Sequence, residues 1–370
     1  CSSDLTDLIV GARTGPVQLL LYSVFRIGTA TNNITWQSFQ DIAQRPEVDW
    51  AVPISLGDSH RQFRVMGTTN DYFTRYKYRG GRDLRFAAGG PMGDLFDAVI
   101  GADVAAQLGY RPGDPIVVAH GLASFSRHED TPFRIKGILA KTGTPVDRTV
   151  IVSLAAIEAI HVDWQSGARK PGAATPADQL RQMQLTPQAI TAALIGVKSR
   201  LQIFGLQRAI NTYPEEPLMA VLPGLALQEL WQIVGVAETA LIAVAGMVVV
   251  TALLGMAAMI LAGLSERRRE MAILRAMGAG PWTIAGLLMA EAVMMAGAGA
   301  LAGIALVQGG MALLRPVLDA RFGLSLPAQA PGLTELAVIG GVLLAAALVS
   351  LLPAIRAYRL SLADGMMVRL

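Results

Sequence analysis

The four histidines of the chain are the first residues to test for metal chemistry. His120 and His128 lie close to an acidic pair, and His161 stands two residues before Asp163. Imidazole and carboxylate groups are common zinc ligands, so these four residues are candidate ligands. Their spacing matches no compact metal motif. We therefore expect ordinary polar surface or turn residues, and no metal or other cofactor held by this chain.

Glu291 is the one acidic residue inside a predicted membrane span. A carboxylate is costly to place in a bilayer, so a residue of this kind is a candidate for function by default. Its position in the first third of the span also allows a structural role, in which it pairs with an arginine near the membrane surface. The sequence leaves both roles open.

A charged segment separates two long apolar stretches, and its residues are the strongest candidates for contact with a partner. They are Glu266, Arg267, Arg268, Arg269, Glu270, Met271, Leu274, Arg275, Ala276 and Gly278. Met271, Leu274 and either Met277 or Gly278 recur at helical spacing, which predicts a short amphipathic helix with an apolar stripe. The small residues beside this face suit docking against another protein. The alternative is that the arginines only set the orientation of the chain in the membrane.

Motifs for catalysis are absent from the sequence. It contains no Gly-x-x-x-x-Gly-Lys-Ser/Thr loop for nucleotide phosphates, no Gly-x-Ser-x-Gly elbow and no His-Glu-x-x-His zinc motif. The net charge of +3 gives no reason to expect nucleic acid as a partner. We expect a chain that is not an enzyme, and any ATP hydrolysis that drives it would take place on a separate subunit.

Residues 1–224 are predicted to form a soluble α+β domain, because short apolar runs alternate with turn residues and helical patterns. A hairpin turn is expected at Gly57-Asp58. Strands are expected at 17–25, 48–56, 61–67, 98–100, 116–119, 133–139 and 149–152, helices at 35–45, 102–108, 154–161 and 200–211, and a surface loop at 165–178.

Residues 225–370 are predicted to form an all-α membrane domain. A helix over 225–263 would be roughly 58 Å long, whereas a bilayer core is about 30 Å thick, so half of it should protrude as a stalk. The spans are expected at about 239–263, 282–308 and 336–355. Gly299 and Gly303 would give the second span a face for close helix packing.

Arginine placement predicts the orientation of these spans. Arginine-rich segments at 267–275 and 356–369 are separated by two spans, so both should face the cytoplasm. The domain at 1–224 is then extracytoplasmic, and a further span is expected upstream. The first five residues, Cys1 to Leu5, are interpreted either as a sequencing artefact or as the acylated start of a lipoprotein.

The segment Glu266 to Ala279 resembles the coupling segment of ABC-transporter permeases of the MacB/FtsX/LolC type, and residues 6–230 more diffusely resemble a MacB-like periplasmic core domain. This resemblance implies a multi-pass protein of the bacterial inner membrane with its large domain in the periplasm. It also implies a cytoplasmic ATPase partner that carries ATP and Mg²⁺, and pairing of two permease copies. The output would be export or extraction of a lipid, lipoprotein, peptide or small molecule.

Two other functions stay open at this stage. An FtsX-like regulator would use the same machinery to switch a periplasmic hydrolase. A membrane-tethered metal-binding module would use the histidines instead. A neighbouring gene for a P-loop ATPase would favour the transport permease or the FtsX-like regulator over the metal-binding module.

Overall fold

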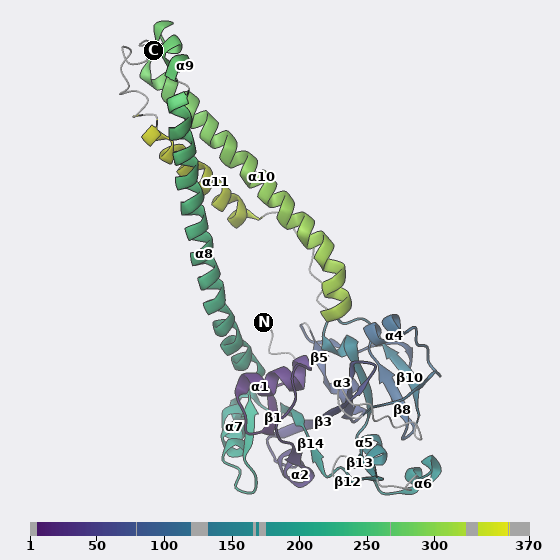
Figure 1. Ribbon diagram of the computed structural model, residues 1–370. Helices are drawn as coiled ribbons and strands as arrows, with labels where there is room; N and C mark the ends of the chain where they lie inside the picture. Colours follow the sequence, from purple (N-terminus) through teal and green to yellow (C-terminus); the bar gives the residue numbers. More distant parts are fainter. Residues whose placement is uncertain are drawn as a thin grey trace. The chain divides into compact units, whose positions relative to one another are not determined.

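The chain divides into two compact units, Cys1–Ile233 and Val234–Leu370, in the computed structural model (Figure 1). The structure describes residues 6–78, 80–119, 132–165, 168–169, 175–266, 268–322, 332–353 and 355.

The first unit is built on one mixed β-sheet. Over the described residues its strand order is β16-β1-β15-β3-β4-β11-β8-β10-β7, with β9 paired to β10. β8 pairs in parallel with β10, and β4 with β11, while the other neighbours run antiparallel. The strands are β1 Leu8–Ala12, β3 Val48–His60, β4 Phe63–Thr68, β7 Phe86–Gly89, β8 Asp97–Ile100, β9 Pro115–Ile116, β10 Phe133–Leu139, β11 Thr149–Ser153, β15 Ala192–Val197 and β16 Leu218–Val221.

Short pairs of strands and several helices complete this unit. The pairs are β2 Ile34–Thr35 with β14 Ala189–Ile190, β5 Lys77–Tyr78 with β6 Arg82–Asp83, and β12 Trp164–Gln165 with β13 Ala168–Arg169. The helices are α1 Pro16–Leu20, α2 Trp36–Ala43, α3 Asp71–Arg75, α4 Ala102–Leu108, α5 Leu154–His161, α6 Ala177–Gln182 and α7 Ile203–Asn211, with the π-helix η1 Leu21–Phe25 and the 3₁₀ turns η2 Pro145–Arg148 and η3 Arg200–Gln202.

Both faces of the sheet are covered, because successive side chains of a strand point to opposite sides. Ile9 and Ile151 belong to a cluster on one face, together with buried residues of α1 and α3. Their neighbours along the same strands lie in two clusters on the other face. One contains Phe39 of α2 and Leu206 of α7, and the other contains residues of α4 and α5. The expected α+β class is confirmed.

The strand expected at 17–25 is wrong. This segment is α1 followed by η1, with Pro16 at the first helical turn and Leu19 and Leu20 buried. A short apolar run of this kind fits a strand or a buried helix equally well, and Pro16 favours a helix start. The π-helix η1 ends at Arg26, whose backbone is left-handed with a φ of 60°.

The hairpin turn expected at Gly57-Asp58 is also wrong. β3 continues through these residues to His60, and the turn lies at Arg61 and Gln62, whose φ angles are 45° and 75°. Two positive φ angles are typical of the tight turns that suit the twist of paired strands. The pairing register shifts between Leu56 and Ser59, so Gly57 and Asp58 form a β-bulge instead.

Several helix predictions are confirmed, and the expected end signals operate. The side chain of Thr35 accepts a hydrogen bond from Ser38 N at the start of α2, and Ser153 caps α5 in the same way. Such caps satisfy backbone N–H groups that have no partner within the helix. Gly109 ends α4 with a left-handed φ of 70°.

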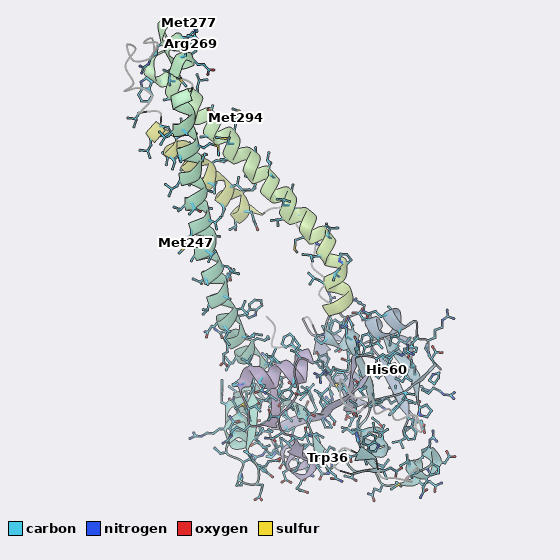
Figure 2. All side chains as sticks on the ribbon, viewed as in Figure 1. Trp36, His60, Met247, Arg269, Met277 and Met294 are labelled. Atoms are coloured by element: carbon cyan, nitrogen blue, oxygen red, sulfur yellow. The ribbon has the colours of Figure 1, made fainter. Side chains whose placement is uncertain are left out.

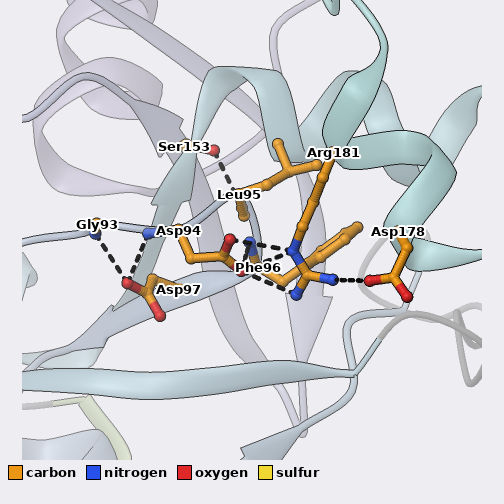
Figure 3. Close-up of polar contacts among 8 residues, drawn as sticks. All are labelled: Gly93, Asp94, Leu95, Phe96, Asp97, Ser153, Asp178 and Arg181. Carbon is orange, nitrogen blue, oxygen red and sulfur yellow. Dashed lines mark hydrogen bonds and ion pairs between the residues drawn. The ribbon is translucent and has the colours of Figure 1, made fainter.

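α6 is fastened to the first unit by Arg181 (Figure 3). The Nε of Arg181 donates to Asp94 Oδ1 at 3.0 Å and its Nη2 donates to Asp94 Oδ2 at 3.0 Å. The guanidinium also pairs with Asp178 at 2.8 Å and lies 5.3 Å from the ring centre of Phe96. Leu180, the residue before Arg181, is 2% exposed. A buried apolar contact and a bidentate ion pair therefore hold α6 against the rest of the first unit.

The outer edge of β16 is closed by side chains of α7. Asn211 Oδ1 accepts a hydrogen bond from Ala220 N at 2.7 Å, and Gln207 Nε2 donates to Ala220 O at 3.0 Å. These bonds satisfy backbone groups that an edge strand otherwise offers to another chain. Only Leu222 separates β16 from the next helix, in which Ala226 is 2% exposed within the core cluster that includes Ile9.

The described part of the second unit consists of helices and the short connections between them. Its helices are α8 Pro223–Glu266, which begins in the first unit, α9 Arg268–Ala276, α10 Pro281–Phe322 and α11 Leu333–Val349. Within the described residues, three segments are long and apolar enough to cross a membrane: Pro223–Gly263, Trp282–Leu318 and Leu333–Pro353. The first has 41 residues, about twice what a bilayer core requires.

Candidate functional site

α9 is a short helix between two candidate spans, and its end has a defined geometry. Gly278 has a φ of 94°; its N–H donates to Arg275 O at 2.9 Å, and Ala279 N donates to Leu274 O at 3.0 Å. This pair of bonds is the Schellman cap, which ends a helix with a left-handed residue that is usually glycine. The chain can therefore turn sharply from α9 into α10.

One side of α9 packs on the spans of its own unit. Met271 lies against a cluster formed by Ile260 of α8 with Ile284, Leu288 and Ala292 of α10. Leu274 and Arg275 are half-buried. The apolar stripe predicted from Met271 and Leu274 thus serves largely to hold α9 on the helices that flank it.

The opposite side of α9 is exposed and only partly polar. It carries Arg269, Glu270, Ile273, Ala276 and Met277 at helical spacing. Ile273 is 52% exposed and Met277 is 72% exposed. Figure 2 shows Arg269 and Met277 together at the α9 end of this unit. Charged residues beside two exposed apolar side chains make a face suited to a protein partner.

Ile273 was not predicted as a site residue. Met277 was expected, as an alternative to Gly278, in one apolar stripe with Met271 and Leu274, but the structure places it on the exposed face. The arginines drew attention to the segment, but they do not tell which apolar positions turn outward. A helical projection of residues 268–277 would have separated Ile273 and Met277 from Met271 and Leu274. It would not have indicated which of the two groups faces the spans.

The other predicted residues of the segment are placed as follows. Ala276 and Gly278 are exposed, and a Cβ added at Gly278 would meet no atom within 4 Å. Gly278 therefore has a backbone role in the cap and leaves an open surface beside it. The side chains of Glu266, Arg267 and Arg268 lie outside the described residues.

The predicted intramembrane residues all lie on α10. Glu291 is half-buried and precedes Ala292 of the apolar cluster. Gly297 approaches Leu343 of α11, whose side chain would lie 4.0 Å from an added Cβ. Gly299 and Gly303 have open space at the same distance, so a packing role for them stays a prediction.

The histidine candidates do not form a joint site over the described residues. His120 and His128 lie outside them. His161 is held by Ile157 O, 2.7 Å from its Nδ1, while Asp163 accepts hydrogen bonds from Thr175 N and Oγ1. Nowhere in the described ranges do three potential metal ligands gather. Asp58, which was not predicted, places its Oδ1 3.9 Å from Nε2 of His161.

Comparison with known proteins assigns both units. The family described as MacB-like periplasmic core domain matches residues 4–193, about half of the chain. The family described as FtsX-like permease C-terminal matches residues 242–362, which include α9 and the helices around it. The chain belongs to the MacB/FtsX-type permeases. Permeases of this type are membrane subunits that work with ABC ATPase partners, and they are generally not catalytic.

Two solved structures align with this chain at low TM-scores. The periplasmic region of MacB from Actinobacillus actinomycetemcomitans aligns with a TM-score of 0.38 and 10% identity, covering 62% of this chain and 94% of that one. The extracellular domain of the noncanonic ABC-type transporter YknZ from Gram-positive bacteria aligns with a TM-score of 0.33 and 12% identity, covering 58% of this chain and 98% of that one. No curated protein matches the chain.

Proposed function

We propose that this chain is the permease subunit of an ABC complex and that α9 is its contact with a separate cytoplasmic ATPase. The observation that carries the proposal is the exposed face of α9, where Ile273 and Met277 stand outward beside Arg269 and Glu270. Apolar side chains at the centre of an interface supply affinity, and charges around them select the partner.

Movement of α9 would reach the first unit through α8. In the sequence, Arg267 alone separates the end of α8 from the start of α9. At its other end, only Leu222 lies between β16 and the start of α8. Ala226 and Pro223 are buried at its start, and Leu225 N and Ala226 N both donate to Leu222 O at 3.1 Å. A short connection packed into the core sheet resists bending, so it suits transmission of a mechanical movement.

The remaining parts of the proposal follow from the family. Two copies of the chain would pair in the bacterial inner membrane, with the first unit in the periplasm. ATP and Mg²⁺ would bind to the ATPase and not to this chain. The moving periplasmic domain would export or extract a lipid, lipoprotein, peptide or small molecule.

The direct test is association with the ATPase after an outward residue of α9 is made acidic. The tagged chain is expressed with its candidate P-loop ATPase partner, and both co-purification and ATP hydrolysis are measured. Ile273→Asp and Met277→Asp should each lower association roughly tenfold or more, as expected for central interface residues. Leu201→Asp is the matched control, because Leu201 is apolar and 95% exposed in the first unit.

The control should leave both readouts unchanged. Normal association and hydrolysis in both α9 variants, at normal membrane abundance, would remove the assignment of α9 as the contact.

A further inference from the structure

The first unit contains a cleft of about 570 Å³ that the proposed coupling does not use. It lies between the start of α5, the segments 68–70 and 92–95, and α6 with the residues that follow it. Trp36, the first residue of α2, also contributes to the lining. A cleft of this size can enclose a small organic molecule.

Most of the large side chains in the lining are apolar. Met92, Leu154 and Leu180 are 8%, 6% and 2% exposed, so they belong to the buried wall of the cleft. Met183 is different, because 42% of this apolar residue is exposed. A ligand in the cleft would remove part of this apolar surface from water, which favours binding.

The charged groups of the lining are already paired. Asp94 and Arg181 are the charged residues among the described lining residues. The Nε and Nη2 of Arg181 donate to the two carboxylate oxygens of Asp94, and its Nη1 donates to Asp178 at 2.8 Å (Figure 3). A bidentate pair of this kind satisfies both charges within the protein. The cleft therefore offers no uncompensated charge to attract an ionic ligand.

The uncharged polar side chains of the lining each make a hydrogen bond, except Thr69. Ser153 caps α5, Thr68 Oγ1 donates to Pro53 O at 2.7 Å, and the amide of Asn70 donates to a backbone carbonyl at 2.8 Å. Thr69 Oγ1 is buried and has no hydrogen-bond partner within the described residues. A buried hydroxyl in this condition is costly. Thr69 lines the cleft, so a step between staggered χ1 rotamers can turn its hydroxyl towards a ligand.

Trp36 and the two methionines favour an aromatic ligand. The ring of Trp36 packs against that of Phe39, with the ring centres 4.9 Å apart. An indole makes further favourable contacts with a ring placed beside it in an offset or edge-to-face arrangement. The thioether sulfurs of Met92 and Met183 also interact well with aromatic rings, and their flexible side chains adapt to the shape of a ligand.

We propose that this cleft binds a neutral aromatic small molecule, with its ring among Trp36, Met92 and Met183 and one polar group bonded to Thr69. The polar group can be a hydroxyl or a carbonyl, because a threonine hydroxyl both donates and accepts. A charged molecule would lose its hydration without gaining a counter-ion. The proposal concerns binding alone, so it holds whether or not α9 contacts an ATPase.

Protection of a cysteine at the cleft tests the proposal in the full chain, reconstituted in nanodiscs of phosphatidylcholine. In a Cys1→Ser background, Met183→Cys, which keeps a sulfur at this position, is labelled with a water-soluble maleimide at rising free concentrations of a probe. Naphthylmethanol is the neutral probe, and naphthylmethylamine and naphthoate are its cationic and anionic counterparts. The neutral probe should slow labelling saturably, whereas the charged probes should not do so over the same range.

Matched controls show whether the protection belongs to the cleft. Leu201→Cys, at a position that is 95% exposed in the same unit, should react at the same rate with and without each probe. Thr69→Val removes the hydroxyl with little change of shape and should weaken protection about threefold to tenfold, the range for one neutral hydrogen bond. Thr212→Val, at an exposed position outside the cleft, should change nothing.

A thermal melt checks that both valine variants remain folded, and the comparison of the three probes decides the matter if Thr69→Val does not. Wild-type protection in folded Thr69→Val overturns the proposal. Equal protection by the charged probes, or no protection by naphthylmethanol, also overturns it. Stronger protection by a neutral apolar tetrapeptide than by naphthylmethanol would contradict the assignment to a small molecule, because a peptide would then be the better occupant.

Discussion

Gly278 allows the backbone role of the α9 end to be separated from a role in docking. Its φ of 94° is strained for any residue with a Cβ, and a left-handed conformation costs such residues about 1 kcal/mol. An added Cβ would meet nothing within 4 Å, so no steric clash inside the chain adds to this cost. Gly278→Ala should therefore open the cap about fivefold more often, with little effect on the rest of the protein.

Hydrogen exchange measures this directly. The amides of Gly278 and Ala279, which donate to Arg275 O and Leu274 O, should exchange about fivefold faster in Gly278→Ala. Gly278→Asn is the control, because asparagine tolerates the left-handed region better than alanine, and its rates should stay closer to wild type. Unchanged exchange at both amides in Gly278→Ala would refute the assignment of this cap.

Three further expectations follow from the first unit and its placement. In a Cys1→Ser background, Leu201→Cys should react with a membrane-impermeant maleimide in spheroplasts and Met277→Cys only after permeabilisation, and the reverse pattern would overturn the topology. The hydrogen bond from Arg181 lowers the pKa of Asp94. The Asp94–Arg181 ion pair should therefore contribute its full stabilisation at pH values above the pKa of Asp94 in the unfolded chain, about 3.9. This stabilisation should be lost as the pH falls through the lower pKa of Asp94 in the folded protein. Thermal melts should show a small acid loss that Arg181→Ala lacks; an equal loss in that variant would contradict the pairing. Asn211→Ala should destabilise the protein by about 1–3 kcal/mol because Ala220 N loses its acceptor, and an unchanged melting temperature would argue against that edge bond.

The sequence predicted the elements that carry local signals. Thr35 and Gly109 marked helix ends, and the charged run at 266–275 marked α9. Short apolar runs were harder to assign, because nine residues at 17–25 fit a strand as well as a helix. The turn after β3 was misplaced because glycine and aspartate suit a bulge as well as a turn, whereas Arg61 and Gln62 give no turn signal.

Contacts between distant residues could not be predicted from local patterns. Asp58 and His161 come from different elements, and only the pairing of β3 with β4 and the packing of α5 bring their side chains together. His161 and Asp163 are close in sequence, yet they have different partners. The outward direction of Ile273 and Met277 likewise depends on how Met271 packs against α8 and α10.

Photo-cross-linking from α9 tests the central claim most directly. A benzophenone amino acid placed at position 277, where Met277 is 72% exposed, is irradiated in cells that contain the co-expressed ATPase. The same amino acid at position 201, which is 95% exposed in the first unit, is the control. We predict a covalent product with the ATPase from position 277 and none from position 201. Absence of that product from position 277, with the ATPase present and the chain in the membrane, would contradict it.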